Sequence, residues 1–117
     1  MSRAKPPKRG DLVRLDFDPQ MGHEQSDFRP ALVVSNSLYN EHSSTIVVCP
    51  ITSRQRGWPF EIVLPAGKVE GFVLVDQVRA VDWRARKMRF LGTCSDEFLH
   101  EIDVSLDVLL RGASQDA

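Results

Sequence analysis

The stretch "DFDPQMGHEQSDFRPALVV", residues 16–34, predicts two neighbouring strands joined by a polar loop. The alternating strand before the loop ends at Phe17. A continuous apolar run begins at Pro30 or Ala31 and is typical of a strand covered on both faces. Ordinary turns use Gly, Pro, Asn or Asp for backbone reasons. This loop instead carries a candidate base, an acid, an amide and a fixed cation, which indicates a chemical role: His23, Glu24, Gln25, Asp27 and Arg29.

Beyond this hairpin, apolar and polar residues mostly alternate with a period of two, which indicates strands. Residues 35–42 interrupt the pattern with a short helix or turn that opens at Ser35. Pro50 is expected at the end or edge of its strand, because proline has no N–H for the ladder. Residues 71–83 are expected to form one long strand or a bent pair. The other strands are expected at residues 10–17, 30–35, 45–51, 59–64 and 86–95.

One long helix is expected near the end of the chain, over residues 95–112. Ser95 can cap its start, Asp96 and Glu97 suit the positive end of the helix dipole, and Gly112 suits a C-cap. Short strands followed by one closing helix predict a mainly β fold with a C-terminal α-helix, built as a small twisted barrel or sandwich. The helix has an apolar stripe that is expected to pack on the core: Phe98, Leu99, Ile102, Leu106, Leu109 and Leu110.

The composition indicates one ordinary globular domain. The chain has 117 residues, of which 42% are hydrophobic and 26% are charged. A flexible basic arm is expected over residues 1–10, a single domain over 11–112 and a tail over 113–117. No apolar run approaches the roughly 18 residues of a membrane helix. No apolar segment follows the basic start as in a secretory signal, so a cytoplasmic location is the expectation.

Metal and cofactor chemistry have little support in the sequence. The three histidines, His23, His42 and His100, are far apart, and the two cysteines have no zinc-ligand spacing. Phosphate-binding glycine motifs and the nucleophile-elbow motif are both missing from the sequence. Cys49 follows an apolar run, which predicts a buried residue rather than a reactive thiol. We therefore expect no metal and no cofactor.

Charge and aromatic residues leave two interpretations open. The net charge is −1, but residues 79–89 are strongly basic with only Asp82 opposing. This run fits a solvated strand pair that carries arginines, and it also fits a face that attracts phosphate. Hydroxyl groups, arginines and aromatic rings also gather in residues 49–60. That combination fits a groove for single-stranded RNA, and it equally fits a polar hairpin whose aromatic residues pack on the domain: Thr52, Ser53, Arg54, Arg56, Trp58 and Phe60.

Three blocks of the sequence together resemble the MazF/PemK/Kid toxins of bacterial toxin–antitoxin modules. They are "GDLVRLDFDPQMGHEQSDFRPALVVS" (residues 10–35), "CPITSRQRGWPFEIVL" (49–64) and "GFVLVDQVRAVDWRARK" (71–87). They occur in the family's order within roughly residues 10–110. The resemblance implies an SH3-like or CcdB-like small barrel (PemK-like) with a C-terminal helix, assembled as a homodimer.

The resemblance also implies a metal-independent endoribonuclease, an mRNA interferase, that cuts single-stranded RNA at a short sequence. The family's essential arginine falls on Arg29, its essential threonine on Thr52 and its loop glutamate on Glu24. In this interpretation the RNA 2′-hydroxyl is the nucleophile and Glu24 takes its proton. Arg29 stabilises the developing charge and can protonate the leaving oxygen, while Thr52 donates to the phosphate. The expected products are a 2′,3′-cyclic phosphate and a 5′-hydroxyl end.

The expected partners are RNA (mRNA, rRNA or tRNA) and a cognate antitoxin whose disordered, acidic C-terminal segment orders in the same groove. Apolar antitoxin residues would enter pockets near Trp58 and Trp83, unless Trp83 belongs to the core. Arg14 stands where many relatives carry an aromatic residue, and Trp58 where a tyrosine is common. The residues assigned to substrate binding are His23, Gln25, Ser53, Arg54, Arg56, Trp58, Asp76, Gln77, Arg84 and Arg86.

Two rival functions share this scaffold, because a fold does not fix a function. One is a CcdB-like, non-enzymatic toxin that binds a protein target such as gyrase. The other is an RNA-binding protein without catalysis. Arg29 and Thr52 together argue against the CcdB-like toxin. Cleavage of RNA in the presence of EDTA separates the endoribonuclease from these two rival functions.

Overall fold

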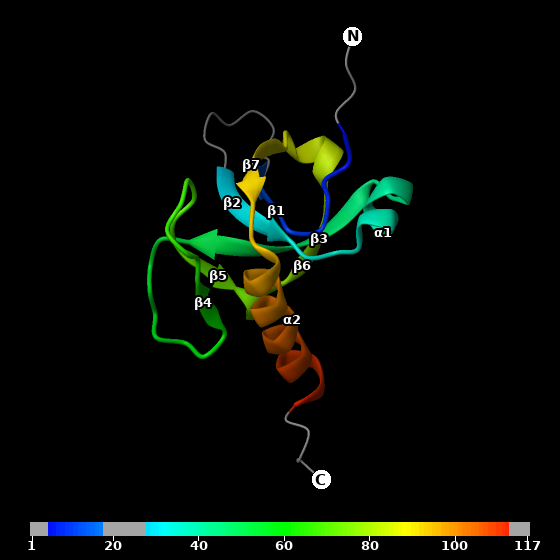
Figure 1. The fold of residues 1–117 in the computed structure, drawn as a ribbon. Coiled ribbons are helices and arrows are strands. Elements are labelled where there is room, and N and C mark those ends of the chain that lie inside the picture. Colours follow the sequence, from blue (N-terminus) through cyan, green and yellow to red (C-terminus); the bar gives the residue numbers. More distant parts are fainter. Residues whose placement is uncertain (1–4, 18–27, 113–117) are drawn as a thin grey trace.

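The strands form one antiparallel sheet in the order β4-β5-β3-β2-β1-β7, and β6 pairs with β3 (Figure 1). The computed structural model describes residues 5–17 and 28–112. The strands are β1 (Asp11–Asp16), β2 (Phe28–Val33), β3 (Thr45–Thr52), β4 (Glu61–Val63), β5 (Phe72–Leu74), β6 (Arg79–Asp82) and β7 (Arg89–Thr93). The helices are α1 (Ser37–His42) and α2 (Asp96–Arg111), with 3₁₀ turns η1 (Val75–Gln77) and η2 (Trp83–Arg86).

The first hairpin is longer than the sequence predicts. Strand β2 begins at Phe28, so the expected start at Pro30 or Ala31 is wrong. The reason is the partner strand: β1 stays paired as far as Asp16, which lies opposite Phe28, and this pairing extends the ladder past Pro30. Arg29 therefore sits inside a strand, opposite Leu15, rather than in the loop.

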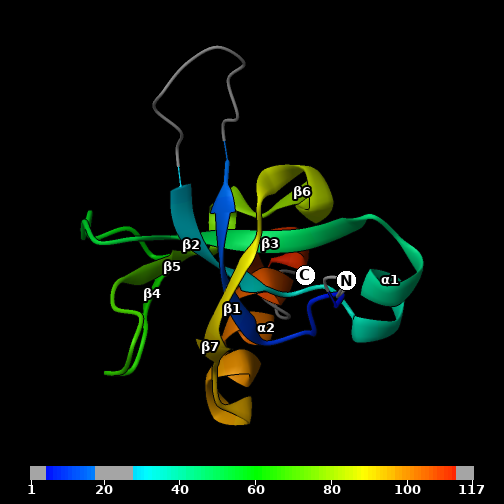
Figure 2. The ribbon, with the colours of Figure 1, turned by 90° about the horizontal axis from the view of Figure 1, so that it is seen from above.

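Strand β3 is the centre of the sheet (Figure 2). One edge pairs with β2, while the other pairs first with β6, from Thr45 to Val48, and then with β5, at Ile51 and Thr52. Pro50 lies between these two partners and does not end the strand, contrary to expectation. A residue without an N–H fits the position where the strand changes partner. The expected bent pair at residues 71–83 is confirmed, with η1 as the bend.

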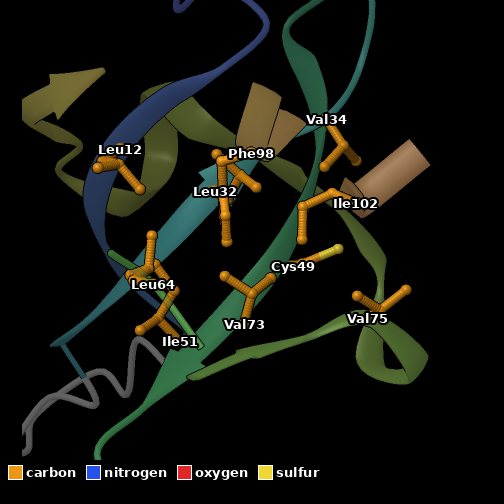
Figure 3. Packing of buried hydrophobic residues seen from close by; sticks show 10 residues of the cluster. All are labelled: Leu12, Leu32, Val34, Cys49, Ile51, Leu64, Val73, Val75, Phe98 and Ile102. Carbon is orange, nitrogen blue, oxygen red and sulfur yellow. The ribbon is translucent and has the colours of Figure 1, made fainter. Parts of the chain in front are cut away.

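Alternation along the strands creates a core on each face of the sheet. Leu12 points to one face, whereas Val13 and Leu15 point to the other. The second core includes Phe17, Val81 and the buried Trp83. Figure 3 shows the first core, which α2 covers: Leu12, Leu32, Val34, Cys49, Ile51, Leu64, Val73, Val75, Phe98 and Ile102.

Helix α2 forms as its sequence predicts. The Ser95 hydroxyl accepts a hydrogen bond from the Phe98 N–H at 3.1 Å, and Gly112 ends the helix with a φ of 78°. Phe98 and Ile102 are buried in the core. Leu110 is an exception to the predicted stripe, because it is 74% exposed on the last turn, which extends past the sheet in Figure 1.

The segment before β1 is attached to the domain. The Asn40 side chain donates to the Pro7 carbonyl at 2.9 Å, and Asn40 is itself buried. The Arg9 guanidinium donates to the Val34 carbonyl at 2.8 Å and forms an ion pair with Asp103 of α2. Residues 7–10 are thus hydrogen-bonded to the domain, while a flexible arm before them stays a prediction. Residues 1–4 and the expected tail 113–117 lie outside the described residues.

The observed architecture agrees with the predicted class, a mainly β fold closed by a C-terminal helix. Strands β4 and β7 are the two ends of the sheet. In the part of the chain that the structure describes, neither helix is long and apolar enough to span a bilayer.

Candidate active site

A small surface pocket lies where β2 begins and β3 ends. Its volume is about 240 Å³. In the β2–β3 ladder Ala31 lies opposite Pro50, and continuing that register places Arg29 opposite Thr52. Antiparallel pairing thus brings together two residues that are distant in sequence. The pocket is lined by Arg29, Pro30, Ile51, Thr52, Ser53 and Glu70.

Thr52 is fixed by its neighbours on both sides. It pairs with Phe72 of β5, and its hydroxyl oxygen accepts a hydrogen bond from the Arg54 N–H at 3.2 Å. Gly71 has a φ of 139°, and a Cβ there would lie 2.5 Å from the Thr52 carbonyl oxygen. The backbone of residue 71 can approach Thr52 this closely only because it is glycine.

The loop after Thr52 is held by two carboxylates. The Glu61 side chain accepts hydrogen bonds from the N–H groups of Arg56, at 2.9 Å, and Gly57, at 3.2 Å. The Trp58 indole N–H donates to the Asp76 carboxylate at 3.0 Å. Trp58 is 53% exposed, so its ring remains available for stacking beside the pocket.

Asp76 also acts on the core behind it. Burial raises the pKa of the Cys49 thiol from 9.0 to about 12, and the negative charge of Asp76 contributes to the rise. A buried thiol with a raised pKa is a poor nucleophile. The prediction that Cys49 is buried is confirmed, and a covalent cysteine mechanism is disfavoured.

The basic segment supplies cations with different surroundings. Arg79, on β6, places its guanidinium 5.4 Å from the centre of the Phe17 ring. Arg84 is exposed and lies over the ring of the buried Trp83. Arg86 is half-buried and donates through Nη1 to the carbonyls of Asp16 and Phe17, at 3.1 and 2.8 Å. Trp83 thus belongs to the core, and an antitoxin pocket beside its ring is not supported.

A protein-family model described as "PemK-like, MazF-like toxin of type II toxin-antitoxin system" matches residues 8–110. The chain belongs to this toxin family. The match covers β1 to α2 and includes the whole pocket. The family resemblance that the three sequence blocks predict is therefore confirmed.

Curated relatives and solved structures agree with this assignment. The endoribonuclease toxin MazF of Escherichia coli is 40% identical over 104 residues, covering 89% of this chain and 94% of that protein. The endoribonuclease EndoA of Bacillus subtilis is 29% identical over 109 residues, covering 88% of this chain and 93% of that protein.

Two crystal structures from Deinococcus radiodurans have the same fold. MazF superimposes with a TM-score of 0.81 at 44% identity, covering 92% of this chain and 98% of that one. A MazE-MazF structure gives a TM-score of 0.85 at 43% identity, covering 94% of this chain and 100% of that one.

The structure brings some of the toxin's predicted site residues together and separates others. Arg29, Thr52 and Ser53 line the same pocket. Trp58 and Asp76 are hydrogen-bonded to each other and do not line it. Arg54, Arg56 and Gln77 are exposed near these elements, and Arg84 and Arg86 belong to η2. His23, Glu24, Gln25 and Asp27 lie outside the described residues, which stop at Phe17 and resume at Phe28. Their roles stay predictions.

Sequence reasoning missed three residues of this site: Glu70, Gly71 and Glu61. The signal for Gly71 was a glycine directly before an apolar strand, which often marks a close backbone approach. Glu70 and Glu61 carry no comparable signal, because their positions depend on how β4 and β5 fold against β3. Among residues 5–17 and 28–112, no group of three His, Cys, Asp or Glu side chains is placed to hold a metal.

Proposed function

We propose that this chain is an endoribonuclease toxin that cleaves single-stranded RNA at a short sequence without a metal ion. The observation that carries the proposal is the pocket in which Arg29 and Thr52 meet. An arginine and a hydroxyl group on adjacent strands suit the non-bridging oxygens of one phosphodiester. The relatives named as endoribonucleases support this reading.

In the proposed reaction the RNA 2′-hydroxyl attacks the adjacent phosphorus. The P–O5′ bond breaks, giving a 2′,3′-cyclic phosphate and a 5′-hydroxyl end. Arg29 stabilises the charge that develops on the phosphate oxygens. The Thr52 oxygen is fixed by the Arg54 N–H, which leaves the hydroxyl hydrogen to donate to the phosphate.

A base must take the proton of the 2′-hydroxyl, and a proton must reach the departing 5′-oxygen. We propose Glu24 as the base, as in the sequence-based hypothesis. Glu70 is the alternative, because among the described residues it lines the pocket together with Arg29. Arg29 remains charged in nearly all settings, so its contribution is mainly electrostatic.

The decisive experiment is cleavage in excess EDTA. Purified protein is incubated with a long single-stranded RNA, and the cut sites are mapped by primer extension. We expect fragments with 5′-hydroxyl ends at a recurring short sequence. Loss of all cutting on chelation, with recovery on adding Mg²⁺, would reject the metal-free mechanism. Binding of RNA without cutting under any condition would favour a non-catalytic protein.

We further propose that the toxin works in the cytoplasm as a homodimer, neutralised by a cognate antitoxin. The MazE-MazF structures support an antitoxin partner. Helix α2 carries an exposed apolar surface that a second copy of the chain could cover, formed by Val104, Val108 and Leu110. The exposed basic residues Arg84 of η2 and Arg89 of β7 suit both RNA phosphates and the carboxylates of a disordered acidic antitoxin segment.

Charge reversal tests whether the antitoxin and RNA share this basic surface. Arg84→Glu is expected to weaken binding of both, and antitoxin association is expected to slow as salt rises, because charge steering is screened over roughly 8–10 Å. Lys68→Glu is the matched control, since Lys68 is exposed on the β4–β5 turn, well away from η2 (Figures 1 and 2). Equal antitoxin affinity in both variants, with RNA cutting continuing in the complex, would contradict a shared surface.

A further inference from the structure

The end of strand β1 is held by an arginine that lies about 70 residues later in the chain. Arg86 donates through Nη1 to the carbonyl oxygens of Asp16, at 3.1 Å, and Phe17, at 2.8 Å. The β1–β2 ladder ends at the pair Asp16 and Phe28. Arg86 therefore supplies donors at the point where strand pairing stops.

A second cation reaches the same point from β6. Arg79 places its guanidinium 5.4 Å from the centre of the Phe17 ring, within cation–π range. Phe17 itself is buried in the second core. The backbone and the side chain of one residue are thus contacted by arginines from two different elements.

The position of Arg86 is fixed by the turn that carries it. The Asp82 carboxylate caps η2 by accepting hydrogen bonds from the N–H groups of Arg84, at 3.1 Å, and Ala85, at 3.4 Å. Trp83 anchors the turn in the core, and Lys87 ends it in the left-handed conformation with a φ of 52°. A capped and anchored turn can hold a strand end in one place.

The strand end that Arg86 holds lies next to the candidate catalytic arginine. Leu15, one residue before Asp16, is the ladder partner of Arg29. A shift of the β1 end would therefore be transmitted through one pair to Arg29. Arg86 Nη1 donates to two backbone carbonyls, which differs from the phosphate contact that the sequence predicts for this residue.

We propose that Arg86 is a positioning residue for RNA cleavage: by fixing the end of β1 it fixes the orientation of Arg29. This inference rests on the proposed endoribonuclease function. It distinguishes Arg86 from Arg84, which lies two positions earlier on the same turn and whose backbone N–H, rather than its guanidinium, bonds to Asp82. Arg84 is available to bind RNA phosphate, whereas Arg86 acts through β1.

The test compares Arg86→Ala, Arg86→Lys and Arg84→Ala on a short RNA containing the cleavage sequence. Arg86→Ala is expected to lower kcat by about 10- to 100-fold, since small misplacements of catalytic groups have effects of this size. Its salt dependence of RNA binding should match that of the wild type. Arg86→Lys, which keeps a charged donor, should recover part of kcat. Arg84→Ala should instead raise KM and reduce the salt slope by about one.

Hydrogen exchange of the Phe17, Phe28 and Arg29 amides gives a readout that does not need cleavage. Faster exchange at these amides in Arg86→Ala, with α2 unchanged, is the expected result. If the alanine variant does not fold, Arg86→Lys carries the same comparison. The proposal would be overturned if the wild type is active and the Arg86 variants keep its kcat but show a reduced salt slope of RNA binding. An inactive wild type with the expected exchange pattern would reject the endoribonuclease function but keep the role of Arg86 at β1.

Discussion

Replacing Arg29 with alanine is expected to reduce RNA cleavage by about 10²- to 10³-fold, the usual cost of losing one donor that stabilises transition-state charge. The side chain is exposed at the start of β2, so the substitution removes little of the core. The thermal unfolding midpoint should therefore stay close to that of the wild type. Single-turnover cleavage with saturating enzyme measures the chemical step separately from binding.

Two further variants define what the Arg29 result means. Thr52→Val removes the hydroxyl but keeps the branched shape, and it should lower the cleavage rate less than Arg29→Ala, because a neutral donor contributes less than a charged one. Arg54→Ala is the comparison variant: it removes an exposed arginine assigned to RNA binding, so at saturating enzyme the rate of its chemical step should stay close to that of the wild type. If Arg54→Ala lost as much activity as Arg29→Ala, the pocket would not be the catalytic centre.

Local patterns were sufficient to predict most elements of the fold. Helix α2 follows from Ser95, Gly112 and an apolar stripe, all of which act within a few residues of one another. The first hairpin follows from alternation and from the apolar run after Pro30. The boundary at Phe28 could not be predicted, because it depends on how far the partner strand continues, and tertiary pairing overrides the local signal of a proline.

The site was predictable only where a residue type carried its own signal. Arg29 stands out because ordinary turns rarely need an arginine, and Thr52 stands out because it falls on the essential threonine of the family block. Glu70 reaches the pocket through the short strand β5, which pairs with β3 over only two residues. Arg86 looked like a phosphate ligand because a basic run gives no information about which cation bonds to a distant carbonyl.

Replacing Gly71 with alanine is expected to damage both stability and catalysis. The new Cβ would lie 2.5 Å from the Thr52 carbonyl oxygen and 3.1 Å from Ile51, and the backbone φ of 139° is strained for any side chain. Backbone strain and overpacking together should lower the free energy of unfolding by on the order of 3 kcal/mol. Because the clash is with Thr52 itself, cleavage should fall by about 10²-fold in the protein that remains folded.

Two other glycines separate the causes of this loss. Gly57 has a φ of 75° but no atom within 4 Å of an added Cβ, so Gly57→Ala carries the backbone cost alone, about 1 kcal/mol. Gly92 has neither a positive φ nor a close neighbour, and Gly92→Ala should leave stability nearly unchanged. Chemical denaturation and single-turnover cleavage of all three variants give the comparison. If Gly71→Ala behaves like Gly57→Ala in both measurements, contact with Thr52 is not the reason that residue 71 is glycine. The close approach of residue 71 to the pocket then has no catalytic consequence.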